Sequence, residues 1–314
     1  TRKPGLRQLC AQAQVEMVNA EAVAFRLGPR LNAAGRLEDA RLAFELLTTG
    51  DEAVAVSLAE RLEALNRERQ GLVKRALAEA GPAAARQLAA GERVIIVENG
   101  AWHPGIVGLI AGKLSEAHNH PVLAFTRAAD DGAWVASCRS VPGFDLTAML
   151  IRFHDFFTRS GGHALAAGLT VPGDRLPLFR ESLWSWAREV LTGKVPEPEF
   201  AVDCRVRAEE LTLANSRALL RLEPFGQGNR EPLLQLDGLE LLESRRIGKE
   251  KDHFRCSFRT PAGRCAVIGF GMGDFADRFP AGCRVDILGH LRENEYQGYR
   301  SPQLVLRDMR PAAS

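Results

Sequence analysis

Apolar residues recur at helical spacing over much of the first 90 positions. Residues 15–27 follow this pattern, and Gly28-Pro29 is predicted to break it. Residues 51–80 are predicted to form one long helix, with Asp51 as its N-cap and an apolar face that carries Leu58, Leu62 and Leu65. Gly81-Pro82 is predicted to interrupt it before a second, alanine-rich helix that ends near Ala90. A long charged helix of this kind is expected to connect two compact regions.

Strand and helix patterns alternate between residues 92 and 192. Short apolar runs, typical of buried strands, are separated by segments with helical periodicity. The predicted strands are 93–97, 122–125 and 134–136, and the predicted helices are 104–117, 145–157 and 176–191. This alternation predicts an α/β domain.

The chain changes character after residue 192. Residues 193–199, with the sequence GKVPEPE, are predicted to be a linker because of their proline and charge content. Beyond them, short strands separated by glycine, proline and charged turns are typical of a small β-barrel, and they are predicted at 253–258, 264–269, 284–289 and 303–306. A length of 314 residues fits two or three such domains.

The net charge of the chain excludes one class of nucleic-acid-binding protein. The formal net charge is only +2, which excludes a protein that coats DNA through overall basicity but leaves room for a local basic groove. The basic residues are 35 arginines and 6 lysines. The guanidinium fork suits phosphate, although a GC-rich genome explains the arginine excess more simply.

The cysteines and the chain start bear on the cellular setting. The 6 cysteines form no C-x-x-C pair, which disfavours zinc and a disulfide framework and fits a reducing cytoplasm. No apolar run approaches the ~18 residues of a membrane span, and the first residues lack the pattern of a signal peptide. The chain does not begin with methionine, so we expect a piece of a longer protein.

Three clusters combine glycine with polar side chains. In the first, Arg30, Asn32 and Arg36 lie among small residues in a predicted loop, where they would grip a phosphate or a nucleotide. The alternative is a surface turn with solvated arginines. In the second, Ser137, Arg139 and Ser140 follow a predicted strand, and they offer a guanidinium and two hydroxyls to a terminal phosphate. Ordinary polarity at a strand end is the alternative there.

In the third cluster, Gly161 and Gly162 are predicted to form a tight turn beside a ligand that His163 contacts, although a single histidine is often structural. His103 precedes a predicted helix N-terminus, which is a natural anion site, while packing is the simpler role for its neighbour Trp102.

Other motifs do not carry chemistry. His118-Asn119-His120 resembles a nuclease motif in letters, but it ends a predicted helix and has no partner ligands nearby. The glycines at 269, 271 and 273 lack the strand–helix context of a dinucleotide site. The sequence contains no dense cluster of aspartate and histidine such as a two-metal nuclease needs.

Aromatic and cationic residues alternate in the predicted barrel, a composition that suits single-stranded nucleic acid. Phe258 is expected in the core. Tyr296 and Tyr299, beside Gly298 in a predicted loop, are better candidates for base stacking.

These clusters, in this order, resemble the RecJ family of single-strand-specific 5′→3′ exonucleases, within the DHH phosphoesterase superfamily. The resemblance spans almost the whole chain and rests on these stretches: 25–36 (FRLGPRLNAAGR), Trp102-His103 with Gly105 and Gly108, 137–140 (SCRS) with Pro142-Gly143, 161–163 (GGH) with 166–168 (AAG), 224–229 (PFGQGN) with Glu231-Pro232, and 294–298 (NEYQG) with Gln303-Leu304.

The resemblance implies an α/β fold with four parts: the C-terminal end of a DHH domain (1–48), a connector helix (49–91), a DHHA1 domain (92–195) and an OB-fold barrel (200–314). It also implies a hydrolase that uses Mn²⁺ or Mg²⁺ in the intact enzyme. The family's metal motifs and its Asp-His-His signature are absent from this chain, so we expect no catalytic or metal-binding residue in it and no activity from it alone.

The resemblance assigns roles by residue. Ser137 and Arg139, with Ser140, match a pocket that senses a 5′-phosphate, and Cys138, where the family commonly has glycine, is expected to narrow it slightly. Arg30, Asn32 and Arg36 match a loop that grips phosphates near the scissile bond. Gly161, Gly162 and His163 match a substrate contact, and His103, Tyr296 and Tyr299 complete the expected binding set.

The implied partner is single-stranded DNA with a 5′ end, and the resemblance also suggests a single-strand-binding protein and a helicase. The implied location is the cytoplasm. Two other functions stay open at this point: a non-catalytic module that binds single-stranded DNA, and a phosphodiesterase for short RNA or cyclic dinucleotides, against which the predicted barrel argues.

Overall fold

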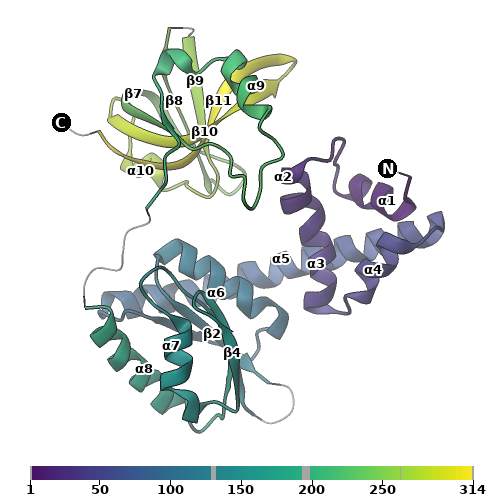
Figure 1. The fold of residues 1–314 in the computed structure, drawn as a ribbon, viewed down its shortest axis with the longest axis vertical. Coiled ribbons are helices and arrows are strands. Elements are labelled where there is room, and N and C mark those ends of the chain that lie inside the picture. Colours follow the sequence, from purple (N-terminus) through teal and green to yellow (C-terminus); the bar gives the residue numbers. More distant parts are fainter. Residues whose placement is uncertain (1, 129–131, 193–198, 262, 313–314) are drawn as a thin grey trace. The chain divides into compact units, whose positions relative to one another are not determined.

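The computed structural model describes residues 2–128, 132–192, 199–261 and 263–312, and the chain divides into two compact units, Thr1–Pro198 and Glu199–Ser314 (Figure 1). The linker predicted at 193–199 falls almost entirely on residues 193–198, which lie outside the described ranges. Each unit has its own apolar core, so each is described by itself.

The first unit begins with short helices packed on one long helix. They are α1 (Pro4–Gln12), α2 (Ala20–Ala22), a π-helical turn (Val23–Leu27), α3 (Gly28–Leu37) and α4 (Arg41–Thr48), followed by α5 (Glu52–Ala89). The predicted break at Gly28-Pro29 is wrong. Gly28 N–H bonds to the carbonyl of Val23 in the wider π pattern, and Pro29 occupies the first turn of α3, where a missing N–H costs little.

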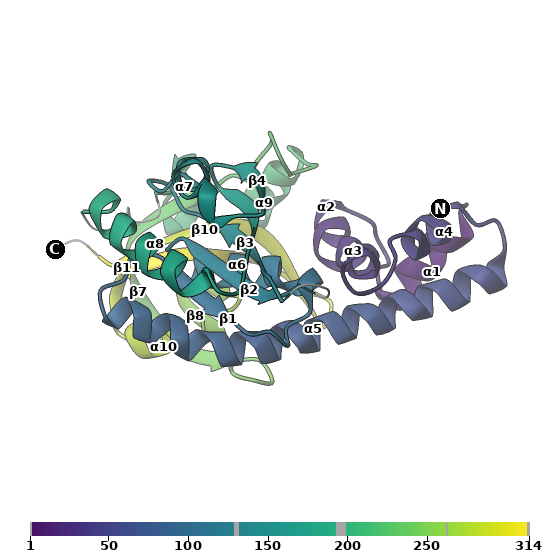
Figure 2. The same cartoon turned by 90° about the horizontal axis from the view of Figure 1, so that it is seen from below.

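Helix α5 is the element on which the first unit is built. Its 38 residues begin at the predicted N-cap, Asp51, whose carboxylate accepts from the N–H groups of Ala53 and Val54. Its first half buries Leu62 and Leu65 against the N-terminal helices, and its second half buries Val73 and Ala76 against the sheet. Figure 2 shows α5 running past both groups of elements. Although α5 is long, none of the helices in the described ranges is apolar enough over sufficient length to cross a membrane.

The predicted interruption of this helix at Gly81-Pro82 is also wrong, because Pro82 lies inside α5. A proline inside a helix removes one backbone hydrogen bond and costs about 3 kcal/mol. Ala80 and Ala84 flank it and are buried in the core against the sheet. Tertiary burial therefore outweighs the local preference for a break.

The rest of the first unit is a mixed five-stranded sheet. Its strands are β1 (Ile95–Glu98), β2 (Val122–Arg127), β3 (Trp134–Arg139), β4 (Arg159–His163) and β5 (Ala166–Val171), in the order β1-β2-β3-β5-β4. Strands β1 and β2 are parallel and the other neighbours are antiparallel. The predicted α/β domain is thus confirmed, and β3 extends three residues beyond its predicted end.

Helices cover the two faces of this sheet to different extents. On one face, α7 (Leu146–Arg152), a 3-10 turn (His154–Phe156) and α8 (Leu176–Val190) cover strands across the sheet, including Ala167 and Leu169 of β5. On the other face, α5 and α6 (Pro104–His118) pack on β1 and β2. Helix α6 also contacts β3. The core on this second face contains no residue of β4 or β5 among the described residues, and β4 is exposed, so the β5–β4 part of the face stays open and β3 lies at its edge.

The second unit is a five-stranded barrel. Strands β7 (Leu234–Ile247), β8 (His253–Thr260), β9 (Gly263–Gly269), β11 (Tyr299–Pro311) and β10 (Arg284–Tyr296) are bonded in that order, and β10 returns to β7 to close the barrel. Only β9 and β11 are parallel among these pairs. Strand β6 (Cys204–Arg205), a 3-10 turn (Ala208–Glu210), α9 (Leu213–Leu220) and α10 (Phe275–Arg278) flank it. The predicted barrel is confirmed.

Two glycines of α6 differ in how closely neighbouring elements approach them. A Cβ at Gly105 would lie 1.8 Å from the carbonyl oxygen of Arg36, at the end of α3. A Cβ at Gly112, on the same helix, would meet no atom within 4 Å. Gly105 thus fixes how the N-terminal helices join the sheet.

We predict that Gly105→Ala destabilises the protein, because the methyl group cannot fit unless α3 and α6 separate. The expected loss in free energy of unfolding is about 1–3 kcal/mol, as for other overpacked sites. Gly112→Ala is the matched control and should be neutral or stabilise by up to about 1 kcal/mol, since alanine favours helix. Urea unfolding followed by circular dichroism measures both, and equal effects would contradict the assigned packing.

The buried cysteines give a prediction for thiol chemistry. Burial raises the pKa of Cys138 and of Cys256 to about 12 and that of Cys265 to about 11. These thiols therefore stay protonated until the pH approaches those values, whereas Cys204 is exposed. At pH 8 we expect iodoacetamide to modify Cys204 rapidly and to leave the three buried thiols intact until the protein is unfolded, as peptide mass spectrometry would show.

Candidate nucleic-acid interface

The open part of the sheet face brings the second and third clusters together. Arg139 pairs with Ala166, which in turn pairs with His163. Residues directly opposite each other on neighbouring strands project to the same face, so Arg139 and His163 lie in one row across β3, β5 and β4. A second row, two residues along, joins Ser137 to Gly168 and Gly161. Small residues between the polar ones leave the backbone accessible to a ligand.

Arg139 is held by neutral groups. Its Nη1 donates to Ser137 Oγ at 3.1 Å and to the carbonyl of Cys138 at 2.8 Å. No carboxylate of the described residues forms a salt bridge with it. A Cβ at Gly108 of α6 would lie 3.1 Å from Ser137 Oγ and 3.4 Å from Arg139 Nη2, so α6 approaches both groups. The arrangement leaves an intact positive charge and a hydroxyl at the edge of an open surface.

Cys138 does not narrow this site, contrary to the expectation. Its side chain is fully buried in the core on the opposite face, beside Leu123 and Ala167. Side chains alternate along a strand, and because β3 continues to Arg139, Cys138 must face away from Ser137 and Arg139. The predicted strand end at 136 hid this alternation.

The predicted tight turn at Gly161-Gly162 is wrong, because both residues belong to strand β4. The hairpin turn comes later, at Ala164-Leu165, where the carbonyls of these two residues accept from the N–H groups of Leu146 and Ser140 at 3.0 Å. Gly162 has φ 151°, and a Cβ there would lie 2.5 Å from the carbonyl oxygen of Ala166. Glycine is needed for this hairpin, and His163 at its end is exposed.

Ser140 serves the same hairpin. Its hydroxyl donates to the carbonyl of Phe144 at 2.6 Å, and its N–H bonds to the hairpin turn. Ser137 therefore presents its hydroxyl toward the open face, while the Ser140 hydroxyl is engaged within the chain.

The first cluster is a helix and not a loop. Arg30, Asn32 and Arg36 all lie on α3. Arg30 lies two and six positions from the other two and therefore points in a different direction, whereas Asn32 and Arg36, four positions apart, share a face of the helix. The three side chains do not converge as a loop would allow. The loop prediction failed because it took Gly28-Pro29 as a break in the helix.

The three residues have different surroundings. Arg30 Nε donates to Glu63 Oε2 at 2.6 Å, and Arg30 Nη1 donates to the carbonyl of Arg26 at 2.6 Å. Asn32 is exposed. Arg36 Nη1 donates to the carbonyl of Gly105 at 3.2 Å and is the residue of the three that reaches α6.

His103 caps helix α6. Its Nδ1 accepts from Gly105 N–H at 3.0 Å, so the histidine itself occupies a donor that an anion would use. The packing role of Trp102 is confirmed, since its ring is buried and its Nε1 donates to Glu79 Oε2 at 2.9 Å.

Sequence reasoning missed Arg69 of α5. Its Nη2 donates to Asn66 Oδ1 at 2.9 Å, and its Nε is buried without a hydrogen-bond partner. Burial lowers the pKa of Arg69, and the positive charge of Arg36 on the neighbouring helix α3 lowers it further. In sequence, Arg69 was one of several charges on a helix face, and no local signal separated it from the others.

In the barrel, Tyr296 and Tyr299 face each other across the β10–β11 turn. Gln297 and Gly298 between them have φ 51° and 80°, as a two-residue hairpin turn requires. The tyrosines are 69% and 82% exposed, whereas Phe258 is fully buried in the core as predicted.

Two arginine pairs lie directly opposite each other on adjacent barrel strands. Arg245 faces Arg255, and Arg259 faces Arg264. Like charges in this position repel each other, and the nearest carboxylate pairing of Arg255 is Glu243 at 3.9 Å. An anion on this surface would relieve the repulsion.

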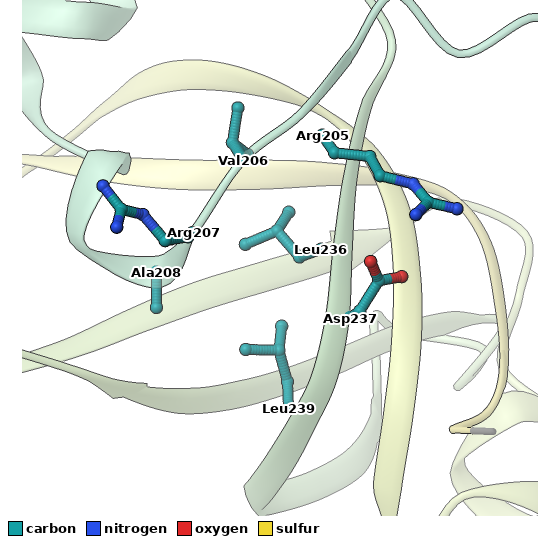
Figure 3. A pocket seen from close by; sticks show the side chains of 7 residues that line it. All are labelled: Arg205, Val206, Arg207, Ala208, Leu236, Asp237 and Leu239. Atoms are coloured by element: carbon teal, nitrogen blue, oxygen red, sulfur yellow. The ribbon is translucent and has the colours of Figure 1, made fainter. Parts of the chain in front are cut away.

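A pocket of about 310 Å³ in the barrel unit lies apart from these groups. Figure 3 shows aliphatic side chains at its centre and the guanidinium groups of Arg205 and Arg207 on opposite sides. None of the predicted site residues lines it.

The described residues do not contain a metal centre. No group of three or more histidine, cysteine, aspartate or glutamate side chains among them could hold an ion. His118 ends α6, and Asn119 follows in the left-handed conformation, as expected for a helix end.

Comparisons with known proteins match this architecture. The DHHA1 domain family matches residues 91–189, and the RecJ OB domain family matches residues 202–308. The single-stranded-DNA-specific exonuclease RecJ of Bacillus subtilis is 32% identical over 310 residues, which cover 98% of this chain and 39% of the relative. RecJ of Thermus thermophilus is 33% identical over 312 residues, with 98% and 42% covered.

Solved structures agree. The crystal structure of RecJ from Thermus thermophilus in complex with Mn²⁺ has a TM-score of 0.82 at 30% identity, and it covers 99% of this chain and 44% of that one. The Mg²⁺ complex of the same protein has a TM-score of 0.81. The chain thus spans less than half the length of these relatives. Its two matched domains and its continuous similarity place this chain in the RecJ family, as the C-terminal portion of a RecJ protein.

Proposed function

We propose that this chain is the substrate-binding part of a 5′→3′ exonuclease specific for single-stranded DNA. The observation that carries the proposal is the row formed by Arg139 and His163, with the row of Ser137 beside it; the other members of these two rows are Ala166, Gly168 and Gly161. Among the described residues, no carboxylate forms a salt bridge or a side-chain hydrogen bond with Arg139, Ser137 or His163. A phosphate is the ligand that such a set of donors attracts.

The open face suits a terminal phosphate better than an internal one. A 5′-monophosphate carries about −1.5 to −2 charges and three free oxygens, whereas an internal diester carries one charge. Arg139 and the Ser137 hydroxyl can each donate to a different oxygen, and His163 can contact the adjoining nucleotide. Arg36, Ser137, Arg139 and His163 are the proposed phosphate and nucleotide contacts of the first unit, with Gly161 and Gly162 leaving room beside them. The family pattern also proposes Arg30, Asn32, His103 and Ser140, but Ser140, His103 and Arg30 already have partners within the chain.

In this proposal, the residues that hydrolyse the phosphodiester bond lie outside this chain. RecJ structures with Mn²⁺ and Mg²⁺ support a divalent metal in the intact enzyme, but the described residues do not fit such a group. The metal ligands would lie in the part of RecJ that this chain does not match, and the isolated chain would bind single strands without cleaving them. The segment boundaries at 48, 91, 195 and 200 are proposed on the same family pattern.

The barrel would hold the incoming strand. Exposed tyrosines at one hairpin tip can stack on bases of any sequence, and the facing arginine pairs can follow the backbone of the strand.

The similarity to RecJ proteins and the match to the RecJ OB domain disfavour the two alternative functions, a dinucleotide phosphodiesterase and a free module that binds single-stranded DNA. A cytoplasmic location, with a single-strand-binding protein and a helicase as partners, is proposed from the family pattern alone.

The first test measures recognition of the 5′ end. For a short single strand, Arg139→Gln should reduce the preference for 5′-phosphate over 5′-hydroxyl by about tenfold or more, the effect of losing a charged hydrogen bond. Arg152→Gln is the matched control, since this arginine is exposed on α7, which covers the opposite face of the sheet. Fluorescence anisotropy gives both affinities, and the strand should stay uncut with Mn²⁺ present. An equal loss for both kinds of end would reject the end-binding role.

A second test addresses the barrel. Tyr299→Ala should weaken binding of a strand long enough to reach the barrel by about 1–3 kcal/mol, since one base loses its stacking partner. Tyr299→Phe keeps the ring and should bind like the original chain, and Phe44→Ala removes an exposed ring of α4 as a control. If Tyr299→Ala weakens very short and long strands equally, the barrel does not guide the strand.

A further inference from the structure

The arginines at the junction of α3 and α5 fall into two groups. Arg30 and Arg67 both pair with the buried carboxylate of Glu63, at 2.6 and 2.8 Å. Arg36 and Arg69 form no salt bridge with any carboxylate of the described residues; their contacts are to the carbonyl of Gly105 and the amide of Asn66. The same two helices therefore neutralise one arginine pair and leave the other charged.

The uncompensated pair is built into the packing. Asn66 is 2% exposed, and its Oδ1 holds Arg69 Nη2 from one turn before on α5. Leu37, which follows Arg36, packs against the core that contains Val73, one turn after Arg69. Both guanidinium groups are thus held from the backbone side by neutral acceptors, which orient them without cancelling their charge.

Two like charges held near each other oppose folding unless a ligand compensates them. Helices α3 and α5 pack on each other, and Leu37, next to Arg36, joins the core that holds Val73, one turn after Arg69, so the two arginines lie on adjoining turns of the packed helices. The lowered pKa of Arg69, for which burial is the larger cause and the charge of Arg36 the second, agrees with this placement. The buried Nε of Arg69 also lacks a partner, so one donor remains unused. An anion that bridges the two groups would satisfy the charge and would lie beside the donor.

Helix α6 relates this pair to the proposed terminal-phosphate site. Gly105 contacts Arg36, and Gly108, one turn later, contacts Ser137 and Arg139. Gly105 and Gly108 thus mark two positively charged sites along α6. The two glycines are about one helical turn apart, roughly 5 Å along the helix axis. Successive phosphates of one strand could occupy both.

We propose that Arg69, together with Arg36, binds an internal phosphodiester of the strand whose 5′ end lies at Ser137 and Arg139, and that Asn66 positions Arg69 for this contact. The inference rests on the proposed function. It adds a binding residue from the long connecting helix, which the sequence analysis did not assign.

The test uses the whole chain and short thymidylate strands that carry either a 5′-phosphate or a 5′-hydroxyl. Arg69→Gln should weaken both by about tenfold, because an internal diester is present in each. The slope of log affinity against log salt should become less steep by about 0.7, the value for one phosphate contact on a single strand. Arg67→Gln, two residues away and paired with Glu63, should change affinity less than twofold.

Asn66→Asp provides an independent variant. It places a carboxylate where the amide holds Arg69, so it should neutralise the site and weaken binding about as much as Arg69→Gln while the guanidinium remains. A stable fold, checked by circular dichroism, is expected for Asn66→Asp because it creates a buried pair.

Three results would overturn the inference while leaving the proposed function intact. The first is that Arg69→Gln binds the strands as tightly as Arg67→Gln does. The second is that Arg69→Gln weakens only the binding of 5′-phosphorylated strands. The third is that Asn66→Asp binds as tightly as the original chain. If the original chain itself binds neither kind of strand, the proposed function fails, which is a separate and recognisable outcome.

Discussion

The apolar stripe of helix α5 is the constraint on which the first unit depends. One helix supplies Leu62 and Leu65 to the core of the N-terminal helices and Val73 and Ala76 to the core beneath the sheet. Two cores that share a continuous helix cannot shift independently, because moving one would expose the other to water. The side chains that matter for ligand binding are therefore placed relative to α5, including Arg69 on the helix itself.

Glycine and alanine determine what the first unit can bind. Gly105 and Gly108 let α6 approach α3 and the sheet closely, and Gly168 and Gly161 leave the backbone uncovered in the middle of the face of β5 and β4. Around these small residues the structure places arginines held by neutral groups, and it pairs other arginines, such as Arg30, with Glu63. An unpaired guanidinium beside bare backbone is a favourable environment for phosphate.

Errors in the sequence-based predictions share one cause. Local rules placed breaks at Gly28-Pro29 and at Gly81-Pro82, a turn at Gly161-Gly162 and a strand end at residue 136, and the structure overturned each of them. Glycine and proline have weak or unfavourable propensities in helices and strands, but burial of neighbouring apolar residues exceeds those local costs. The consequence was specific, since Arg30, Asn32 and Arg36 were placed on a loop instead of a helix, and Cys138 on the wrong side of its strand.

By itself, the sequence determined the two domain types, the α/β and barrel classes, the start of α5 at Asp51 and the burial of Phe258, because periodicity and capping are local properties of the chain. It also contained, as separate motifs, most of the side chains of the candidate site. Only the tertiary structure decided which of them meet. Strand register set Arg139 in line with His163, and helix packing set Arg36 near Arg69. Such proximity arises between residues distant in the chain, where no local pattern records it.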